Sequence, residues 1–374
     1  MSYENTHNDH RVPTIAVVGG GYGGITTAKA LDDVANIVLV DPQDSFVHNV
    51  AALRGVVDPS WAERIFLPYD RLLRHGRVVH DRAAHVDSGG VTLGSGERVA
   101  ADYIVLATGS NYPFPAKVDA EESTTGIAMF HTMHKELAGA ERVLLLGAGP
   151  VGLELAGEIK AVWPHKAVTI VDPASDVVAG RFPDNFRAEV RRQVDALGIE
   201  LLLDTPLRAQ PSSAPGESAP FTVTTQEGRE ITADIWFRCF GVEPVSDYLA
   251  AELAGARTAD GHIEVDAELR LSGARNVFAI GDVTAIPEPK MAKQAGDHAE
   301  VVAANIKALV SGDGELTSYE PGPDGIALPL GPKGGVSFSW DYAPETGMLD
   351  AETTAQVKGE GLMLDTFAEL LGRA

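Results

Sequence analysis

The hydrophobic pattern of this chain contains one arrangement twice. Residues 14–18 form a β-branched apolar run of strand length, which leads through a glycine-rich turn into a stretch of helical character. Residues 142–146 form a second such run, again followed by a glycine-rich turn and a helical stretch. A further short apolar run follows each helix, at 37–40 and 168–171. The pattern therefore predicts two strand–helix–strand units of the kind that build a parallel sheet.

Both turns have the spacing Gly-x-Gly-x-x-Gly. In such a turn the first glycine permits a tight bend, the second lets a pyrophosphate approach the backbone, and the third lets helix and strand pack closely. The N–H groups at the helix start then hold the diphosphate. The expected nucleotide-binding residues are Gly19, Gly20, Gly21, Gly23 and Gly24 in the first turn and Gly147, Gly149, Pro150, Val151 and Gly152 in the second.

An acidic residue ends the second strand of each unit. Asp41 follows Gly19 by 22 positions, and Asp172 follows Gly147 by 25 positions. A carboxylate at this place accepts hydrogen bonds from the ribose hydroxyls of an adenine dinucleotide. The alternative is a pair of sugar- or phosphate-binding turns that take no dinucleotide. Two copies of the full pattern favour two dinucleotide sites.

Three later strand-like runs end in turns of small residues. These turns contain Thr108 with Gly109, then Gly241, and finally Gly281 with Asp282. The last turn occurs once only, and its carboxylate suits a hydroxyl-rich chain such as the ribityl group of FAD. A simple Gly-Asp turn is the alternative. Beside the two glycine motifs, we favour the flavin interpretation.

With these motifs the chain resembles the flavoproteins that have two dinucleotide-binding domains. Among them it is most similar to the apoptosis-inducing-factor-like, ferroptosis-suppressor type of NAD(P)H:quinone reductase, with type II NADH dehydrogenases as more distant relatives. The stretches that carry the likeness are residues 45–54, 107–110 with 113–115, and 288–299. The resemblance implies an α/β fold with two Rossmann-like domains on the glutathione-reductase-like plan and a small C-terminal α+β segment.

The resemblance also implies a reaction. FAD would occupy the first domain and NAD(P)H the second, with a hydride passing from NADH to flavin N5 and two electrons passing on to a small quinone-like acceptor. Relatives that reduce disulfides use paired cysteines in the first domain, and residues 44–55 contain none. A ferredoxin- or rubredoxin-type reductase and a redox-sensing flavoprotein with slow turnover are the alternatives.

Individual site residues follow from the same resemblance. Glu154, two residues after the second glycine turn, matches a glutamate near the nicotinamide, and Lys358 matches a lysine associated with the active site. These two are the expected catalytic residues. An acid near a helix N-terminus is also favoured by the macrodipole, and a lysine among glycines is commonly solvated. Asn49, Met291 and Ala292 are further expected contacts of FAD.

The choice of nicotinamide depends on Asp172. A carboxylate there bonds the 2′-hydroxyl of NADH and repels the 2′-phosphate of NADPH. The following residues add another acid, Asp176, and no base before Arg181. The sequence therefore favours NADH. The alternative reading is that Asp172 caps the turn that follows it.

Composition narrows the class of protein further. The 374 residues include 30 basic and 53 acidic ones, a net charge of −23, which disfavours nucleic acid, anionic membranes and acidic carrier proteins as partners. The single cysteine, Cys239, excludes an intrachain disulfide. No apolar leader or long apolar run is visible, so we expect a cytoplasmic protein without a stable membrane anchor. The histidines suggest no metal site; His48 and His298 either line the flavin or are structural.

The order of the motifs predicts a discontinuous FAD domain, residues 12–118 and 245–315, with an NAD(H) domain, residues 119–244, inserted in it. Residues 316–374 are expected to contribute a hairpin and a C-terminal amphipathic helix. The apolar face of that helix would pack on the FAD domain, form a homodimer interface or cover the flavin as a lip for a lipophilic acceptor. Its expected members are Met363, Phe367, Leu370 and Leu371.

Overall fold

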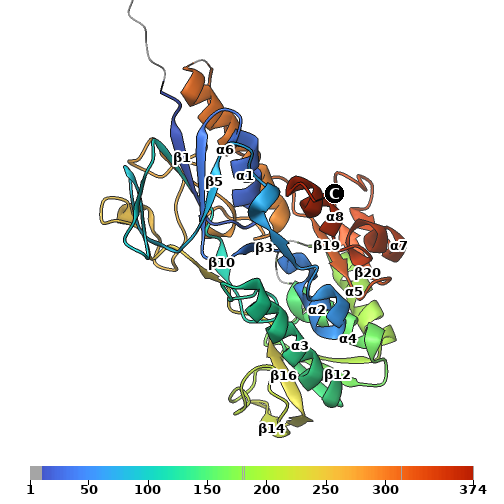
Figure 1. Cartoon of the computed structure of the whole chain (residues 1–374). Helices are drawn as coiled ribbons and strands as arrows, with labels where there is room; N and C mark the ends of the chain where they lie inside the picture. Colours follow the sequence, from blue (N-terminus) through green and yellow to red (C-terminus); the bar gives the residue numbers. More distant parts are fainter. Residues whose placement is uncertain (1–10, 179, 181, 313, 374) are drawn as a thin grey trace, which may run out of the picture. The chain divides into compact units, whose positions relative to one another are not determined.

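The computed structural model describes residues 11–178, 180, 182–312 and 314–373. The chain divides into two compact units. The first comprises the chain up to Pro42 with Tyr69–Ser110 and Pro244–Glu320, and the second comprises Gln43–Pro68, Asn111–Glu243 and Pro321–Ala374. Each unit contains a parallel sheet with helices packed on it, so the predicted α/β fold class is confirmed (Figure 1).

The first unit is built on a five-stranded parallel sheet. Its central strand carries the β-branched run that the pattern predicted, and this strand is apolar along its length because both faces of the sheet are covered. It pairs in parallel with a strand on either side. The strand order is β18 (Val277–Ala279), β9 (Tyr103–Leu106), β1 (Thr14–Val18), β2 (Asn36–Asp41) and β5 (Arg77–His80).

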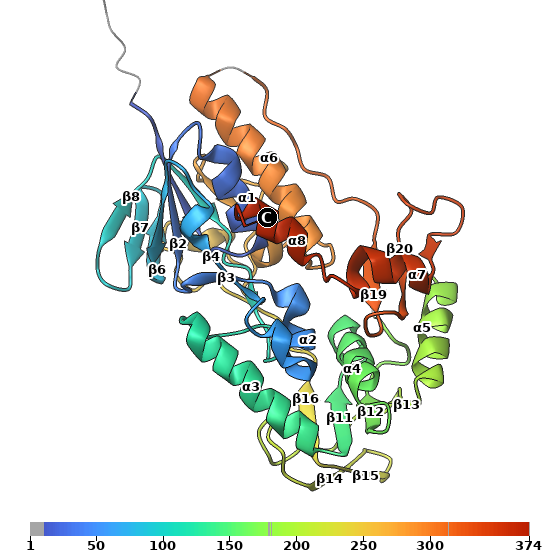
Figure 2. The same cartoon turned by 45° about the vertical axis from the view of Figure 1, so that its right-hand side comes forward.

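Helices pack on this sheet together with a small antiparallel sheet. The helices α1 (Tyr22–Leu31) and α6 (Ala292–Ser311) lie side by side in both views (Figures 1 and 2). Val86, Val91 and Val99 of the antiparallel sheet belong to one buried apolar cluster with residues of the parallel sheet. The three strands concerned are β6 (Ala83–Asp87), β7 (Gly90–Leu93) and β8 (Arg98–Ala100).

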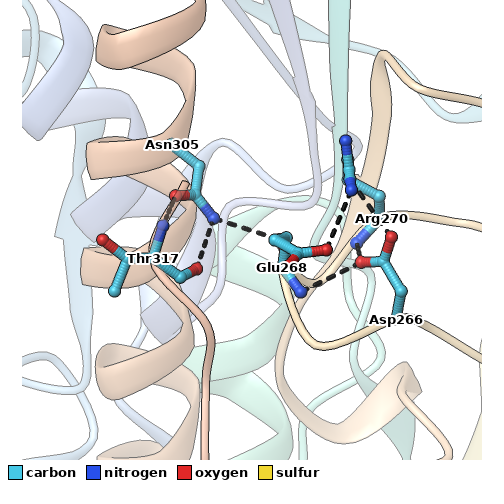
Figure 3. Close-up of polar contacts among 5 residues, drawn as sticks. All are labelled: Asp266, Glu268, Arg270, Asn305 and Thr317. Atoms are coloured by element: carbon cyan, nitrogen blue, oxygen red, sulfur yellow. Dashed lines mark hydrogen bonds and ion pairs between the residues drawn. The ribbon is translucent and has the colours of Figure 1, made fainter. Parts of the chain in front are cut away.

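The buried amide of Asn305 ties α6 to segments before and after it. Its Nδ2 donates to the carbonyl oxygen of Glu268 at 3.2 Å and to that of Thr317 at 2.9 Å, and its Oδ1 accepts from the Thr317 N–H at 2.7 Å (Figure 3). Arg270 closes the neighbouring turn through ion pairs with Asp266 and Glu268. These contacts fix the long helix within the first unit.

The second unit has a four-stranded parallel sheet of the same kind. Its strand order is β13 (Ile199–Leu202), β12 (Ala167–Val171), β11 (Arg142–Leu146) and β16 (Ile235–Arg238). The helices that precede the C-terminal segment in this unit are α2 (Ala52–Val57), α3 (Ser123–Gly139), α4 (Pro150–Val162) and α5 (Asp184–Ala196). Antiparallel pairs complete it, β3 (Ser45–Val47) with β4 (Phe66–Pro68) and β14 (Phe221–Thr224) with β15 (Glu230–Ala233). Two short strands, β10 (Ser110–Asn111) and β17 (Glu243–Pro244), lie where the chain passes between units.

Both predicted strand–helix–strand units are present, β1–α1–β2 and β11–α4–β12. Each helix starts earlier than the apolar pattern suggested, directly after the second glycine of its motif. Gly21 and Gly149 are the N-cap residues, so the third glycine of each motif lies inside the helix. The apolar pattern misses this first turn because glycines carry no hydrophobic signal.

The C-terminal segment forms the predicted hairpin and a short helix. β19 (Ile326–Pro329) pairs antiparallel with β20 (Gly335–Phe338), and β21 (Met348–Leu349) extends the sheet. A short helix α7 (Ala351–Thr354) runs into the π-helical turn Ala355–Gly359, and α8 (Leu364–Leu370) follows.

The apolar face of the last helix differs from the expected one. Met363 precedes α8 in a left-handed conformation (φ 59°) and is 41% exposed, whereas Leu364 and Leu371 are buried. The ring of Phe367 stacks on Phe46, with the ring centroids 5.8 Å apart. The helix therefore packs within the second unit with the expected Phe367 and Leu371, and Leu364 takes the place that was expected for Met363.

Contacts group the chain differently from the expected domain boundaries. Gln43–Pro68 belongs to the second unit, although the sequence assigned it to the FAD domain, and most of the C-terminal segment joins it there. The physical reason is that α2 packs on α3 and α4, while the C-terminal hairpin packs on α4. Which unit holds which cofactor stays a proposal.

Among the helices of the described residues, none has both the length and the apolar character needed to cross a bilayer. The same residues contain no group of three or more His, Cys, Asp or Glu arranged to hold a metal ion.

We expect Phe130→Ala to lower the free energy of unfolding by about 3–5 kcal/mol, the usual cost of deleting a buried aromatic ring. Phe130 is fully buried, and its ring lies near those of Phe66 and Phe114, with centroid distances of 6.3 and 5.1 Å. Val162→Ala, at a 44% exposed position of the same unit, should change the free energy of unfolding by less than about 0.5 kcal/mol. Urea unfolding followed by circular dichroism measures both, and equal shifts would contradict the assigned core.

Candidate functional site

The first glycine turn leaves room for a ligand at one place only. Gly19 has a φ of 104°, and a side chain there would overlap the carbonyl oxygen of Ala107. A side chain at Gly24 would overlap the carbonyl oxygen of Gly19. At Gly21, by contrast, no atom lies within 4 Å of an added Cβ. The open position is the one at which a pyrophosphate would approach the backbone.

The second glycine turn repeats this geometry. Gly147 has a φ of 119°, and an added Cβ would lie 2.9 Å from the carbonyl oxygen of Cys239. A side chain at Gly152 would overlap the carbonyl oxygen of Gly147, whereas Gly149 again has no atom within 4 Å. Neither helix start receives a side-chain cap from its N-cap glycine. Both turns therefore fit a dinucleotide diphosphate held by backbone N–H groups.

Asp41 and Asp172, the acids at the ends of the second strands, each accept a hydrogen bond from an N–H group of the nearby glycine turn. Asp41 accepts a hydrogen bond from the Gly20 N–H at 2.5 Å, and Asp172 accepts one from the Ala148 N–H at 2.6 Å. Asp172 also accepts from the Ala174 N–H at 2.7 Å, which is the turn-capping role given as the alternative. Because a carboxylate has about four lone-pair directions, these two bonds to Asp172 are compatible with a further bond from a ribose hydroxyl.

Tyr69 is a contributor to the first turn that the sequence did not reveal. Its buried hydroxyl donates to the carbonyl oxygen of Gly20 at 3.0 Å. A side chain at Gly20 would overlap this hydroxyl. Tyr69 comes from a segment with no motif, so only the folded chain shows why Gly20 must also be a glycine.

The turns around Thr108 and Gly281 lie together in the first unit. The Thr108 hydroxyl donates to the carbonyl oxygen of Val245 at 2.6 Å, and Gly109 has a φ of 63°. The Ser110 hydroxyl donates to Asp282 at 2.7 Å, so the aspartate is fixed by a residue from the neighbouring strand end. Both turns are thus held by hydrogen bonds inside this unit.

His298 is a structural support of the Gly281 turn. Its Nδ1 accepts from the Gly281 N–H at 3.0 Å, which requires the ring proton to sit on Nε2. That Nε2 lies 2.7 Å from a carboxylate oxygen of Glu288, and the Tyr319 hydroxyl donates to the other oxygen at 2.6 Å. Burial raises the pKa of Glu288, but the bonds from His298 and Tyr319 outweigh it and lower the pKa overall.

The start of α6 carries an unsatisfied polar atom. Met291 is its N-cap residue and Ala292 its first residue, and no side chain caps this helix start. Within the described part of the chain, the buried Oε1 of Gln294 has no hydrogen-bond partner. A buried oxygen without a partner is costly, so it fits a position that faces a bound group.

Glu154 and Lys358, which are 204 residues apart, form an ion pair in the second unit. The Lys358 Nζ lies 2.7 Å from a Glu154 carboxylate oxygen and donates to the Ala327 carbonyl oxygen at 3.3 Å. The side chains are only 11% and 16% exposed, so Lys358 is not a solvated surface lysine. Burial raises the pKa of Glu154, and the charge of Lys358 only partly opposes this.

A second ion pair lies one helical turn further along α4. Arg54 contacts Glu158 through both carboxylate oxygens, at 2.7 and 3.0 Å, and each side chain is 6% exposed. Neither Arg54 nor Glu158 is among the site residues predicted from the sequence. A usable signal existed, because Arg54 interrupts the apolar run 50–57 and Glu158 is spaced four residues from Glu154 in a helix whose only other charged residue is Lys160.

His48 and Asn49 lie in the same unit. The Nε2 of His48 donates to the carbonyl oxygen of Leu362 at 2.7 Å. Burial lowers the pKa of His48 to about 4, the hydrogen bond to Leu362 opposes this, and the charge of Lys358 adds to the lowering. In the part of the chain that the structure describes, the buried Oδ1 of Asn49 has no partner, which fits an expected ligand contact. Gly241, after β16, has a φ of 101° and open space around it.

Comparison with known proteins finds similar sequences over most of this chain. The sequence profile of the family described as "Pyridine nucleotide-disulphide oxidoreductase" matches residues 13–299. The chain is 34% identical to ferroptosis suppressor protein 1 of Taeniopygia guttata over 331 residues, which cover 86% of this chain and 87% of that protein. It is 29% identical to apoptosis-inducing factor homolog B of Dictyostelium discoideum over 376 residues, 96% of each chain.

A solved structure shares the fold. The NAD-dependent persulfide reductase of A. fulgidus superposes with a TM-score of 0.65 at 19% identity. The match covers 84% of this chain and 61% of that chain, so this chain spans less than two thirds of its length.

We expect Gly149→Val to leave the fold intact and to weaken NADH binding by more than about tenfold, because the new side chain would fill the space left for the diphosphate. Gly149 has a φ of −78°, which any residue adopts. Gly152→Val should instead destabilise the second unit, since its side chain would overlap the Gly147 carbonyl. Thermal unfolding and NADH fluorescence titration separate the two effects. Unchanged NADH affinity in Gly149→Val would contradict the assignment.

A pH dependence follows from His48. Its pKa of about 4 lies below the ordinary 6.5, so between these values the unfolded chain binds a proton that the folded chain does not. The contribution of His48 to the free energy of unfolding is therefore complete above pH 6.5. It falls by about 3 kcal/mol as the pH drops from 6.5 to below 4. His48→Gln, which keeps an N–H donor, should remove this loss, whereas His165→Gln, at a 62% exposed side chain, should retain it. Urea unfolding at several pH values measures the slope, and an unchanged slope in His48→Gln would refute the assignment.

Proposed function

Because this chain belongs to the pyridine nucleotide-disulphide oxidoreductase family and is an FAD-dependent NAD(P)H oxidoreductase, we propose that it oxidises NADH and passes two electrons to a small quinone-like acceptor. The observation that carries the proposal is the buried Glu154–Lys358 pair, which lies near the N-terminus of the helix that begins at the second glycine turn.

The family name refers to disulfides, but we propose that this chain uses no disulfide of its own as an electron acceptor. Cys239 is the only cysteine, so the chain has no pair to oxidise and reduce. Burial raises the pKa of the Cys239 thiol to about 12, which keeps it protonated and unreactive near neutral pH. Electrons taken from NADH must therefore leave to a separate molecule.

A quinone is the electron acceptor whose chemistry fits the Lys358–Glu154 ion pair. Its reduction to a quinol takes two electrons and two protons, of which the hydride of NADH brings both electrons and one proton. The second proton comes from water through an acidic group of the protein. Lys358 has an N–H that can donate a proton to an acceptor oxygen, and the Glu154 carboxylate beside it, which is 11% exposed, can take up a proton from water and pass it on to the amine.

Bound FAD would supply the two-electron chemistry that links NADH to the acceptor. The residues proposed to hold it in the first unit are the glycines of the first turn, Asp41, Thr108, Gly109, Gly281, Asp282, Met291 and Ala292. Support comes from the open space at Gly21 and from the unpartnered oxygen of Gln294, both of which fit a bound polar group. The second glycine turn, with Asp172 and Gly241, is proposed to hold NADH.

The preference for NADH is supported by charges around the second turn. Asp172 offers a carboxylate where NADPH would bring its 2′-phosphate. Asp176 adds a second carboxylate, which Arg191 of α5 already neutralises, with the two atoms 2.5 Å apart. A guanidinium engaged in this way is not available to a phosphate. Arg181 lies outside the described residues.

An anaerobic stopped-flow experiment tests the proposal. The FAD-loaded protein is mixed with NADH or NADPH, the oxidised flavin absorbance is followed, and a soluble quinone is then added. We expect faster bleaching by NADH and rapid recovery with the quinone. Bleaching that persists with every quinone would refute the proposed acceptor and favour a sensor or a reductase of a protein partner.

We expect Lys358→Met to slow the recovery with quinone by at least about 100-fold, because the acceptor then loses its proton donor. Glu154→Gln should slow it as well, since the amide cannot restore the proton. Lys333→Met serves as the matched control, because Lys333 is an exposed lysine of the C-terminal hairpin, outside the turn that carries Lys358. FAD content is measured in each variant. Full-rate recovery in Lys358→Met would exclude its catalytic role.

A further inference from the structure

Arg54 uses one guanidinium to join two separate segments of the second unit. Its Nε and Nη2 donate to the two carboxylate oxygens of Glu158, at 3.0 and 2.7 Å. The same Nη2 donates to the Gly359 carbonyl oxygen at 2.6 Å, and Nη1 donates to the Glu360 carbonyl oxygen at 2.9 Å. The side chain is 6% exposed, so water does not compete for these bonds.

The two segments are the ones that carry the proposed catalytic pair. Lys358 belongs to the π-helical turn Ala355–Gly359, and Arg54 binds the two carbonyl oxygens that directly follow it. On the other side, Glu158 lies four residues after Glu154 on α4, which places both on one helix face. One positive group thus anchors the chain beside each partner of the Lys358–Glu154 pair.

The shape of the turn explains why an arginine is needed. A helical end leaves carbonyl oxygens without partners, and those of Gly359 and Glu360 are directed to Arg54. The Glu360 N–H closes the turn on the Ala355 carbonyl at 2.8 Å. A planar fork with five N–H groups reaches a carboxylate and two carbonyls at once, whereas a lysine ammonium has a single nitrogen.

We propose that Arg54 is a positioning residue of this enzyme, which holds the Lys358 turn against α4 and so sets the Lys358–Glu154 contact. The inference rests on the proposed function for its effect on turnover, but its structural part does not. Arg54 does not act on substrate; it acts through Lys358.

The four buried charged side chains around Arg54 alternate in sign, and this allows them to be buried away from water. Two positive groups, Arg54 and Lys358, alternate with two negative ones, Glu158 and Glu154, so the buried set is neutral. A neutral and hydrogen-bonded set avoids the large cost of isolated buried ions. Trp61 also lies under the guanidinium, whose carbon is 5.2 Å from the ring centroid.

The structural part is tested by hydrogen–deuterium exchange of the full-length holoenzyme. In Arg54→Lys, the amides of Glu360, Leu362 and Leu364 should exchange at least about tenfold faster, because the turn loses two anchors. Amides of α5 should exchange at the wild-type rate. The matched control is Arg142→Lys, which alters another arginine–carboxylate pair of the same unit, Arg142 with Asp234 at 2.6 Å, far from the turn in the sequence and bonded to Asp234 rather than to the turn. Wild-type exchange at these amides in Arg54→Lys would overturn the proposal.

The functional part is tested by a double-mutant cycle on recovery with quinone. We expect Arg54→Lys to slow recovery by about 10-fold to 100-fold, the effect of a small misplacement of a reacting group. In a Lys358→Met background it should cause no further loss, because the residue through which it acts is gone. Equal losses in both backgrounds would overturn the proposal, since they indicate general damage.

A second variant covers the case in which Arg54→Lys does not fold. Glu158→Gln keeps the shape of the side chain and the Arg54 bonds to both carbonyls, but it weakens the hold on α4. It should slow recovery in the wild-type background and not in Lys358→Met. If the wild-type protein reduces no quinone, the proposed function fails, while the exchange experiment still decides whether Arg54 holds the turn.

Discussion

The close contact between two glycines in each turn is the constraint on which both units depend. The third glycine of each motif lies in the first turn of the helix, directly against the carbonyl oxygen of the first glycine, and any side chain there would overlap that oxygen. This contact brings the helix N-terminus to the strand end and leaves the middle glycine in open space. The same arrangement therefore fixes the strand–helix packing and creates the place for a diphosphate.

The second constraint is electrostatic. Two ion pairs are buried in the second unit, and they alternate in sign along α4 and the segments packed on it. A buried charge is tolerated only with a partner and satisfied hydrogen bonds. Each of the four groups therefore restrains the others, and the C-terminal turn is held by charge as well as by apolar packing. Burial also raises the pKa of Glu154, which suits a group that holds and releases a proton.

Relatives at about 30% identity and the family match place this chain among the FAD-dependent NAD(P)H oxidoreductases. The residues of this chain narrow the choice of electron acceptor. The family is described by a disulfide chemistry for which this chain has no cysteine pair. What it has instead is the Lys358–Glu154 pair beside the second nucleotide turn. We propose that this pair transfers a proton to an acceptor oxygen, and this proposed role is the reason for proposing a quinone-like acceptor.

The sequence alone determined the strands of the two strand–helix–strand units, both glycine turns, the acids that end the second strands and the C-terminal hairpin. These features are local: they depend on the side-chain period and on glycine sterics over a few residues. Only the tertiary structure decided that Lys358 meets Glu154, that Arg54 binds the Lys358 turn, and that Gln43–Pro68 joins the second unit. It also gave Tyr69 its place against Gly20. Such partners are chosen by packing between segments far apart in the chain, which no local pattern records.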